Sequence, residues 1–350
     1  MTATDEAASP TTKRIRPHHL VIGLGAGVAV FTAISGIVPL VTEWHTEEEV
    51  HREVFGNVPS AVKLAFYVVI PVVVLFGAFS FANRTKNWQR GAPDDRSTTP
   101  KNVKRRMADF RAGVYMKTLL RDPAAGVMHS LIYFSFLILL GVTTTLEIDH
   151  QLPEGAKFLH GDVYRGYAAV GDAAGLALFV GVMWAILRRY VQRPYRIRIK
   201  SKPEHALGLG TILALAVTGF GAEAWRIALA GRPDFERWSF IGYPLSGLIE
   251  DSSTLSGGHQ IWWVAHVGSF VLFLAILPVT MLRHMFTSPL NMYLRDKARP
   301  KGAMKPMPNL METELETFGA STVEDFTWKQ LLDTDACTMC GRCTSVCPAH

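Results

Sequence analysis

Uncharged stretches alternate with charged segments along this chain of 350 residues. Six of the uncharged stretches come close to the roughly 20 residues that a helix needs to cross a hydrocarbon core, or exceed that length. Backbone groups in lipid must find hydrogen-bond partners within their own segment, so we expect each stretch to form a transmembrane helix. The stretches are Leu20–Thr42, Leu64–Asn83, Pro123–Leu146, Gly166–Leu187, Ala206–Ala222 and Ser252–Leu282.

This pattern predicts an all-α membrane protein and excludes a soluble globular enzyme, a disordered protein and a nucleic-acid-binding domain. The 36 Lys and Arg residues concentrate in the tail before the first stretch and in every second connection after it. Such a bias is typical of the cytoplasmic side of a membrane protein. We therefore expect a multi-pass protein of the inner (cytoplasmic) membrane, with its N-terminus and its cysteine-bearing segment in the cytoplasm. The membrane accounts for the basic charge, so we expect no nucleic-acid partner.

The same pattern divides the chain into six parts. They are a cytoplasmic tail (1–19), a transmembrane hairpin (20–83), a basic cytoplasmic loop (84–122), a four-helix domain (123–286), a linker (287–321) and the start of a soluble domain that contains the cysteines (322–350). The chain stops three residues after its last cysteine. We therefore expect it to be the front part of a longer polypeptide.

All four cysteines lie in one run near the end of the chain. Cys337, Cys340, Cys343 and Cys347, followed by Pro348, have the C-x2-C-x2-C-x3-C-P spacing of bacterial ferredoxins, which bind [4Fe–4S] clusters. Zinc sites more often pair two C-x2-C knuckles at a distance, so the run favours an iron–sulfur cluster over zinc or free thiols. Cys347 either completes a single cluster or serves a second one whose motif follows residue 350. We favour the second arrangement.

Histidines near the ends of the predicted helices are candidate haem ligands. His266 and His284 are 18 residues apart on the sixth helix. At 3.6 residues per turn both face one side of it, about 27 Å apart along the axis. Two ligands on one face at opposite depths are what two stacked b-type haems need. Pro278 lies between them, so this register is approximate. The structural alternative is a histidine that only makes hydrogen bonds at the membrane interface.

Each haem needs a second histidine on a facing helix. His129 lies near the start of the third predicted helix, which runs antiparallel to the sixth. It should therefore reach the depth of His284, and this pair is the candidate inner haem site. The sequence does not decide which histidine pairs with His266 at the outer level. The candidates are His160, just before the fourth helix, and then His150 and His259.

Two charged residues in or beside the predicted helices each allow two interpretations. Asp172 is the one charge in the fourth stretch. An ionised Asp near the bilayer centre costs ~2.5–3.5 kcal/mol on insertion scales, so it should face the bundle interior. There it could protonate a quinone, or it could make a structural hydrogen bond to a neighbouring Thr or Trp. Arg283 could face a haem propionate or anchor the basic end of the sixth helix.

The residues around these histidines resemble a known family. Residues 129–134 (HSLIYF) and the Pro-x-x-x-Leu-x-His pattern at 278–284 look like the cytochrome b subunit of respiratory nitrate reductase. They also look like the membrane subunit of methanogen heterodisulfide reductase. With the cysteine run behind it, the chain is similar to the membrane-bound (Fe–S)-binding oxidoreductases of the electron-transfer flavoprotein:menaquinone oxidoreductase type.

The resemblance implies roles for individual residues. It carries over His129 and His284 as the inner haem pair and His266 as one outer ligand. Leu139 stands where the nitrate reductase subunit has its second outer ligand. The outer haem therefore uses another ligand or is absent.

The resemblance also implies a function. Family members pass electrons from electron-transfer flavoprotein, reduced in fatty-acid β-oxidation, through [4Fe–4S] clusters and haem b to menaquinone. We expect membrane lipid, quinone and electron-transfer flavoprotein as partners. One alternative is a quinone-linked redox protein of heterodisulfide or sulfur metabolism. Another is a haem-free membrane anchor for an iron–sulfur domain.

Overall fold

The computed structural model describes residues 16–41, 49–94, 99–198, 201–250, 253–295, 309–314 and 319–348. Within these residues six helices are long and apolar enough to cross a membrane, which confirms the predicted fold class. They are α1 (Pro17–Val41), α2 (Ser60–Gln89), α4 (Pro123–Gln151), α5 (Gly161–Ile186), α7 (Pro203–Leu229) and α9 (Leu255–Ile276). Residues 1–15 of the predicted tail, and 296–308 and 315–318 of the predicted linker, lie outside the described residues.

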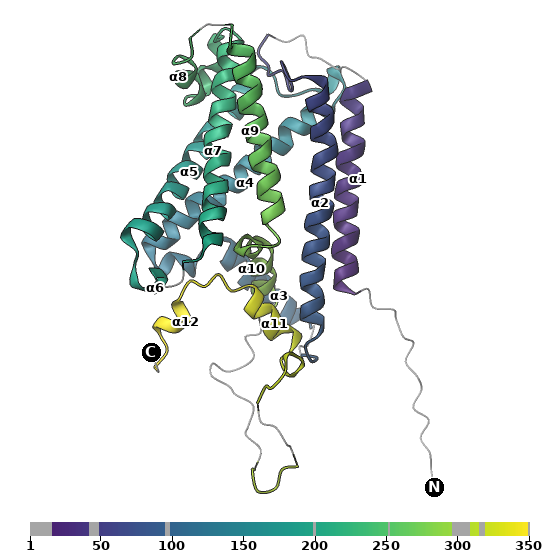
Figure 1. Cartoon of the computed structure of the whole chain (residues 1–350), viewed down its shortest axis with the longest axis vertical. Coiled ribbons are helices and arrows are strands. Elements are labelled where there is room, and N and C mark those ends of the chain that lie inside the picture. The colour runs from purple at the N-terminus through teal and green to yellow at the C-terminus, as the bar shows by residue number, and fades with distance from the viewer. Residues whose placement is uncertain are drawn as a thin grey trace.

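Shorter helices gather at the two ends of this bundle (Figure 1). They are α3 (Pro100–Val114), α6 (Tyr195–Arg198), α8 (Gly242–Ser246), α10 (His284–Tyr293), α11 (Trp328–Asp335) and α12 (Arg342–Ser345). Single turns are η1 (Leu119–Arg121), η2 (Glu154–Ala156), η4 (Asp234–Trp238), η5 (Met281–Arg283), η6 (Val323–Asp325) and the π-helical η3 (Leu187–Gln192). We call the end with α10, α11 and α12 the cysteine end, and the end with α8 the loop end.

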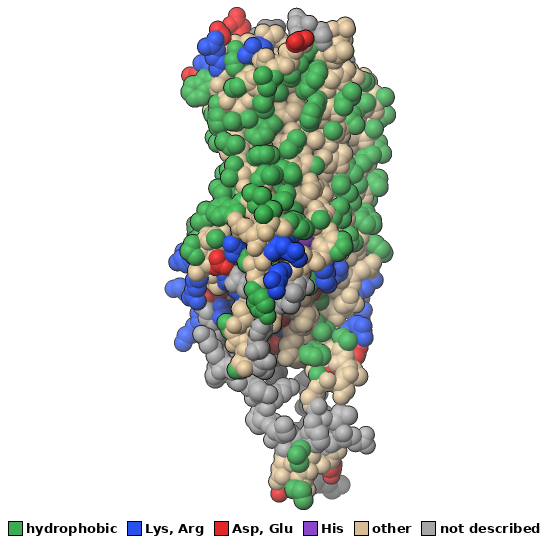
Figure 2. Space-filling view, turned by 60° about the vertical axis from the view of Figure 1, so that its left-hand side comes forward, with side chains coloured by type: hydrophobic (Ala, Val, Ile, Leu, Met, Phe, Trp, Pro, Cys, Tyr) green, Lys and Arg blue, Asp and Glu red, His purple; other side chains and the backbone are tan. Residues whose placement is uncertain are grey.

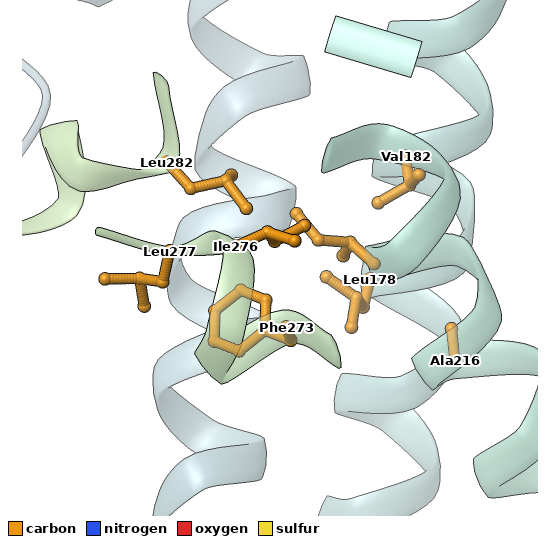
Figure 3. Close-up of a cluster of buried hydrophobic side chains, with 8 residues drawn as sticks. Leu178, Val182, Ala216, Phe273, Ile276, Leu277 and Leu282 are labelled. Atoms are coloured by element: carbon orange, nitrogen blue, oxygen red, sulfur yellow. The ribbon is translucent and has the colours of Figure 1, made fainter. Parts of the chain in front are cut away.

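Apolar side chains form both the core of the bundle and its outer surface. The core lies between α5, α7 and α9 and contains Leu178, Val182, Ile212, Ala216, Phe273, Ile276, Leu277 and Leu282 (Figure 3). Hydrophobic side chains also cover the sides of the bundle, while Lys and Arg gather toward the cysteine end (Figure 2). Phe31 of α1, for example, is 73% exposed. An apolar belt bounded by basic residues is typical of a lipid-facing surface.

Glycines allow the helices of the four-helix domain to approach closely. A Cβ atom on Gly221 of α7 would lie 2.1 Å from the ring of Trp262 of α9, and one on Gly258 of α9 would lie 2.1 Å from the ring of Trp225 of α7. Each helix therefore packs a tryptophan ring against a glycine of the other helix. Small residues at such contacts give membrane helices close van der Waals packing, which stabilises them in lipid.

The sixth span ends earlier than its hydrophobic pattern suggests. The uncharged stretch continues to Leu282, but α9 ends at Ile276, and the chain turns through η5 before α10 begins at His284. Pro278 explains the break, because it lacks a backbone N–H and its ring clashes with the preceding helical turn. The expectation that His266 and His284 share one face of a continuous helix is therefore wrong.

The basic connection after α2 contains a helix that its polar composition did not suggest. Thr99 caps α3 by accepting a hydrogen bond from the backbone of Asn102, and Pro100 follows it. The apolar side of α3 packs on α10, with the rings of Phe110 and Tyr293 6.5 Å apart. The connection is therefore a structured part of the cysteine end, and α10 extends into residues expected to form the linker.

A buried ion pair holds the loop end together. Glu236, which is 1% exposed, accepts hydrogen bonds from Arg226 at 2.5 and 3.1 Å and from the hydroxyl of Tyr164 at 2.8 Å. Burial alone would raise the pKa of Glu236, but the charge and hydrogen bonds of Arg226 outweigh it and hold the pKa below its usual range. The loop between α7 and α9 is thus tied to both α5 and α7.

We expect Gly221→Val to destabilise the bundle by about 1–3 kcal/mol, because the new side chain overlaps Trp262 and forces α7 away from α9. Gly210→Val, at a position on α7 where a Cβ meets open space, is the matched control. Thermal unfolding in detergent measures both. Equal melting temperatures for the two variants would contradict close packing of α7 on α9.

Candidate redox centres

His129 and His284 face each other at the cysteine end. His129 lies in the second turn of α4 and His284 begins α10. Their ring centres are 6.3 Å apart and their planes are inclined by 60°. His284 Nδ1 lies 2.7 Å from the carbonyl oxygen of Met281, so Nδ1 donates there and Nε2 is left for a metal. Among the described residues, His129 Nδ1 is buried without a hydrogen-bond partner.

This arrangement fits an iron ion held by two histidines. A histidine nitrogen binds a metal at about 2.0–2.1 Å and its ring centre lies roughly 1 Å further away, so two ligands on opposite sides of one iron have centres about 6 Å apart. Burial, and then the charge of Arg283, lower the pKa of His284. Its ring is therefore neutral near pH 7, which is the form that binds a metal.

The cysteine run begins in a tightly turning loop after α11 and continues through α12, which contains Cys343, to Cys347. Met339 and Gly341 both have positive φ angles, 51° and 74°. The backbone N–H of Met339 donates to Cys337 Sγ at 3.4 Å. All four cysteines are exposed, and among the described residues no three His, Cys, Asp or Glu side chains converge as metal ligands. The thiol spacing and the left-handed turn fit a cluster, while the ligands are not gathered into a cage.

The structure places His266 and His160 among different neighbours. His266 Nδ1 lies 3.1 Å from Thr218 Oγ1 on α7, and a Cβ on Gly219 would lie 3.3 Å from its ring. His160 directly precedes α5, and its backbone pairs with that of His51. His266 and His160, the predicted outer pair, therefore contact different elements, whereas the rings of His129 and His284 face each other.

The two other candidates for the outer site lie near the loop between α1 and α2. The ring of His150, near the end of α4, lies 5.4 Å from that of Phe55. His259 is buried near the start of α9, and its Nδ1 lies 3.4 Å from Asn57 Nδ2. Both histidines thus have a contact with residues 55–57 of this loop.

Asp172 is buried in α5, and its carboxylate binds backbone groups of the loop end. Oδ2 accepts hydrogen bonds from the N–H groups of Ile241 at 2.5 Å and Gly242 at 3.2 Å, at the start of α8. These contacts favour the structural interpretation of Asp172, although the donors are backbone groups rather than Thr or Trp.

Sequence reasoning missed the partner of Arg283. Its Nε donates to Asp335 Oδ1 at 2.9 Å, and Asp335 is the last residue of α11, two residues before Cys337. A carboxylate next to the cysteine motif is visible in the sequence. Nothing in the hydrophobic pattern indicates that it meets an arginine 52 residues earlier.

Two known domains match this chain. The nitrate reductase gamma subunit domain matches residues 136–299, and a 4Fe-4S binding domain matches residues 328–349. The first match includes His266 and His284 and begins seven residues after His129. The second includes all four cysteines. No solved structure was found to match the chain.

Two curated relatives of this chain are oxidoreductases by name. The chain is 30% identical to a protein named EtfAB:quinone oxidoreductase from Syntrophomonas wolfei, over 85% of this chain and 42% of the relative. It is 26% identical to the probable iron-sulfur-binding oxidoreductase FadF from Bacillus subtilis, over 67% of this chain and 32% of the relative. The chain thus spans less than half the length of these relatives. The domains and relatives together confirm the predicted family, the membrane-bound (Fe–S)-binding oxidoreductases.

We expect His129→Ala and His284→Ala each to abolish the binding of one haem per chain, because each removes one of two opposed ligands. A reduced-minus-oxidised optical spectrum with haem-to-protein stoichiometry measures this. His19→Ala, which changes an exposed histidine of α1, is the control and should keep the full haem content. Full haem content in His129→Ala or His284→Ala would contradict the assigned pair.

Proposed function

We propose that this chain, as a member of the membrane-bound (Fe–S)-binding oxidoreductases, passes electrons between a soluble donor and a quinone in the membrane. One observation carries the proposal. The segment with the cysteine run lies against the same end of the bundle at which His129 and His284 oppose each other (Figure 1). An iron–sulfur cluster and a haem b, when bound at these residues, would supply one-electron carriers on either side of the membrane boundary.

The residues of the chain hold and tune these sites. The thiolates of Cys337, Cys340 and Cys343 would hold a cluster, with Cys347 completing it or serving a second one. His129 and His284 would hold the inner haem. The hydrogen bond from His284 Nδ1 to Met281 fixes which nitrogen points away from the backbone and keeps the ring oriented.

We infer that electron-transfer flavoprotein is the donor and menaquinone the acceptor. The family resemblance supports both, and the name of the Syntrophomonas relative couples EtfAB to a quinone. The quinone would enter from the lipid. A lipid-facing groove of about 400 Å³ between α4 and α5 is lined by apolar side chains, with Thr145 and Tyr167 as its polar members.

We further propose that the cysteine end faces the cytoplasm of a bacterial cell membrane. The Lys and Arg residues that gather toward this end support that orientation (Figure 2). In the cytoplasm the thiols stay reduced and a soluble flavoprotein can reach them.

The donor is tested with the full-length protein in detergent, loaded with cluster and haem. We expect reduced electron-transfer flavoprotein to drive reduction of a menaquinone analogue, and Cys340→Ser to abolish this reduction because the cluster is lost. Quinone reduction by a dithiol donor but not by the flavoprotein would support the sulfur-pathway alternative. A folded, cluster-bearing protein without haem would support the membrane-anchor alternative.

A further inference from the structure

We propose that Asp335 is a positioning residue that locks the cysteine-bearing segment onto the end of the bundle carrying His129 and His284. The inference rests on the proposed function, and it adds that electrons pass between two fixed centres. The iron–sulfur segment would not swing on its linker to reach the membrane domain.

Both carboxylate oxygens of Asp335 accept hydrogen bonds, from side chains of α2 and of η5. Oδ1 accepts from Arg84 Nη1 at 3.0 Å and from Arg283 Nε at 2.9 Å, and Oδ2 accepts from Trp88 Nε1 at 3.2 Å. The Asp335 side chain is only 13% exposed. One acid thus joins α11 to the end of α2 and to η5, beside His284.

The two arginines are themselves held by the break after α9. Arg84 Nε donates to the carbonyl of Pro278 at 2.9 Å, and Arg283 Nη1 donates to the carbonyl of Thr280 at 2.8 Å. The break imposed by Pro278 leaves these carbonyls available to side chains. Both guanidinium groups are therefore oriented before Asp335 joins them, which reduces the conformational entropy lost in the contact.

A second anchor lies inside the cysteine run itself. Arg342, between Cys340 and Cys343, donates to the carbonyls of Thr118 at 3.2 Å and Leu119 at 3.5 Å. These residues lie at the start of η1, the short turn before α4, and α4 is the helix that carries His129. The segment is therefore attached to the elements of both histidines, through Asp335 on one side and Arg342 on the other.

The chain offers a matched control for the charge of Asp335. Arg90 and Glu324 also pair the end of α2 with the C-terminal segment, at 2.7 Å, but both side chains are 54% exposed. An exposed pair of this kind contributes little, because water and salt screen it. Removing the charge of Glu324 should therefore leave the segment docked.

The experiment compares Asp335→Ala, Asp335→Glu and Glu324→Gln in the full chain with cluster and haem bound. After rapid reduction of the cluster by a chemical donor, stopped-flow absorbance gives the rate of haem reduction. Redox titration gives both potentials. Hydrogen exchange at residues 328–345 reports whether the segment stays docked.

We expect Asp335→Ala to slow haem reduction by roughly tenfold to a hundredfold, as small misplacements of reacting groups do. It should raise hydrogen exchange in the segment while both potentials and both cofactor contents stay unchanged. Asp335→Glu should restore part of the rate, and Glu324→Gln should match the wild type. Wild-type rate and exchange in Asp335→Ala would overturn the inference. The inference would also be overturned if haem reduction in Asp335→Ala slowed only in proportion to a loss of bound cluster or haem.

Failure of the proposed function gives a different result. A chemical donor replaces the flavoprotein and no quinone is needed, so a wrong donor or acceptor leaves this comparison intact. Haem reduction that is equally fast in Cys340→Ser would show that electrons bypass the cluster. That result would overturn the proposed electron route and, with it, the role of Asp335.

Discussion

Pro278 has no backbone N–H, and the arrangement of the cysteine end follows from that missing donor. α9 cannot continue past it, so the chain turns and restarts as α10 with His284 at its first position. The turn directs His284 toward His129 of α4. It also makes the carbonyl of Pro278 available to Arg84, and the carbonyl of Thr280, which accepts the Arg283 N–H as well, orients the guanidinium of Arg283. A single residue thereby shapes both the histidine pair and the surface on which the cysteine segment lies.

The rest of the bundle serves to hold this end in place within lipid. Water is absent there, so helix packing depends on close van der Waals contact rather than on the hydrophobic effect. The exchanged glycine–indole contacts of α7 and α9 meet that need. At the loop end, the carboxylate of Asp172 accepts hydrogen bonds from backbone N–H groups at the start of α8, and that of Glu236 accepts from the side chains of Arg226 and Tyr164. Two buried carboxylates thus hold the loop end onto α5 and α7.

The sequence predicts the helices well because six uncharged stretches of this length allow few other folds. It also predicts the cysteine motif, whose spacing is local. His129 and His284 could be paired because antiparallel spans bring their ends to equal depth. The partners of Asp335 and Arg342 could not be predicted, since each contact joins residues more than 50 positions apart and neither follows a periodic pattern. The helix at Pro100–Val114 was missed because its composition is mostly polar, although Thr99 and Pro100 form a recognisable start signal.

The ion pair of Arg226 and Glu236 makes the stability of the loop end depend on pH in one direction. A carboxylate with a lowered pKa contributes stability above its unfolded pKa, near 4.3, and loses it only as the pH falls through the lower folded value. The ion pair at the loop end therefore keeps contributing stability as the pH falls, down to values at which a glutamate without such a partner would already be protonated.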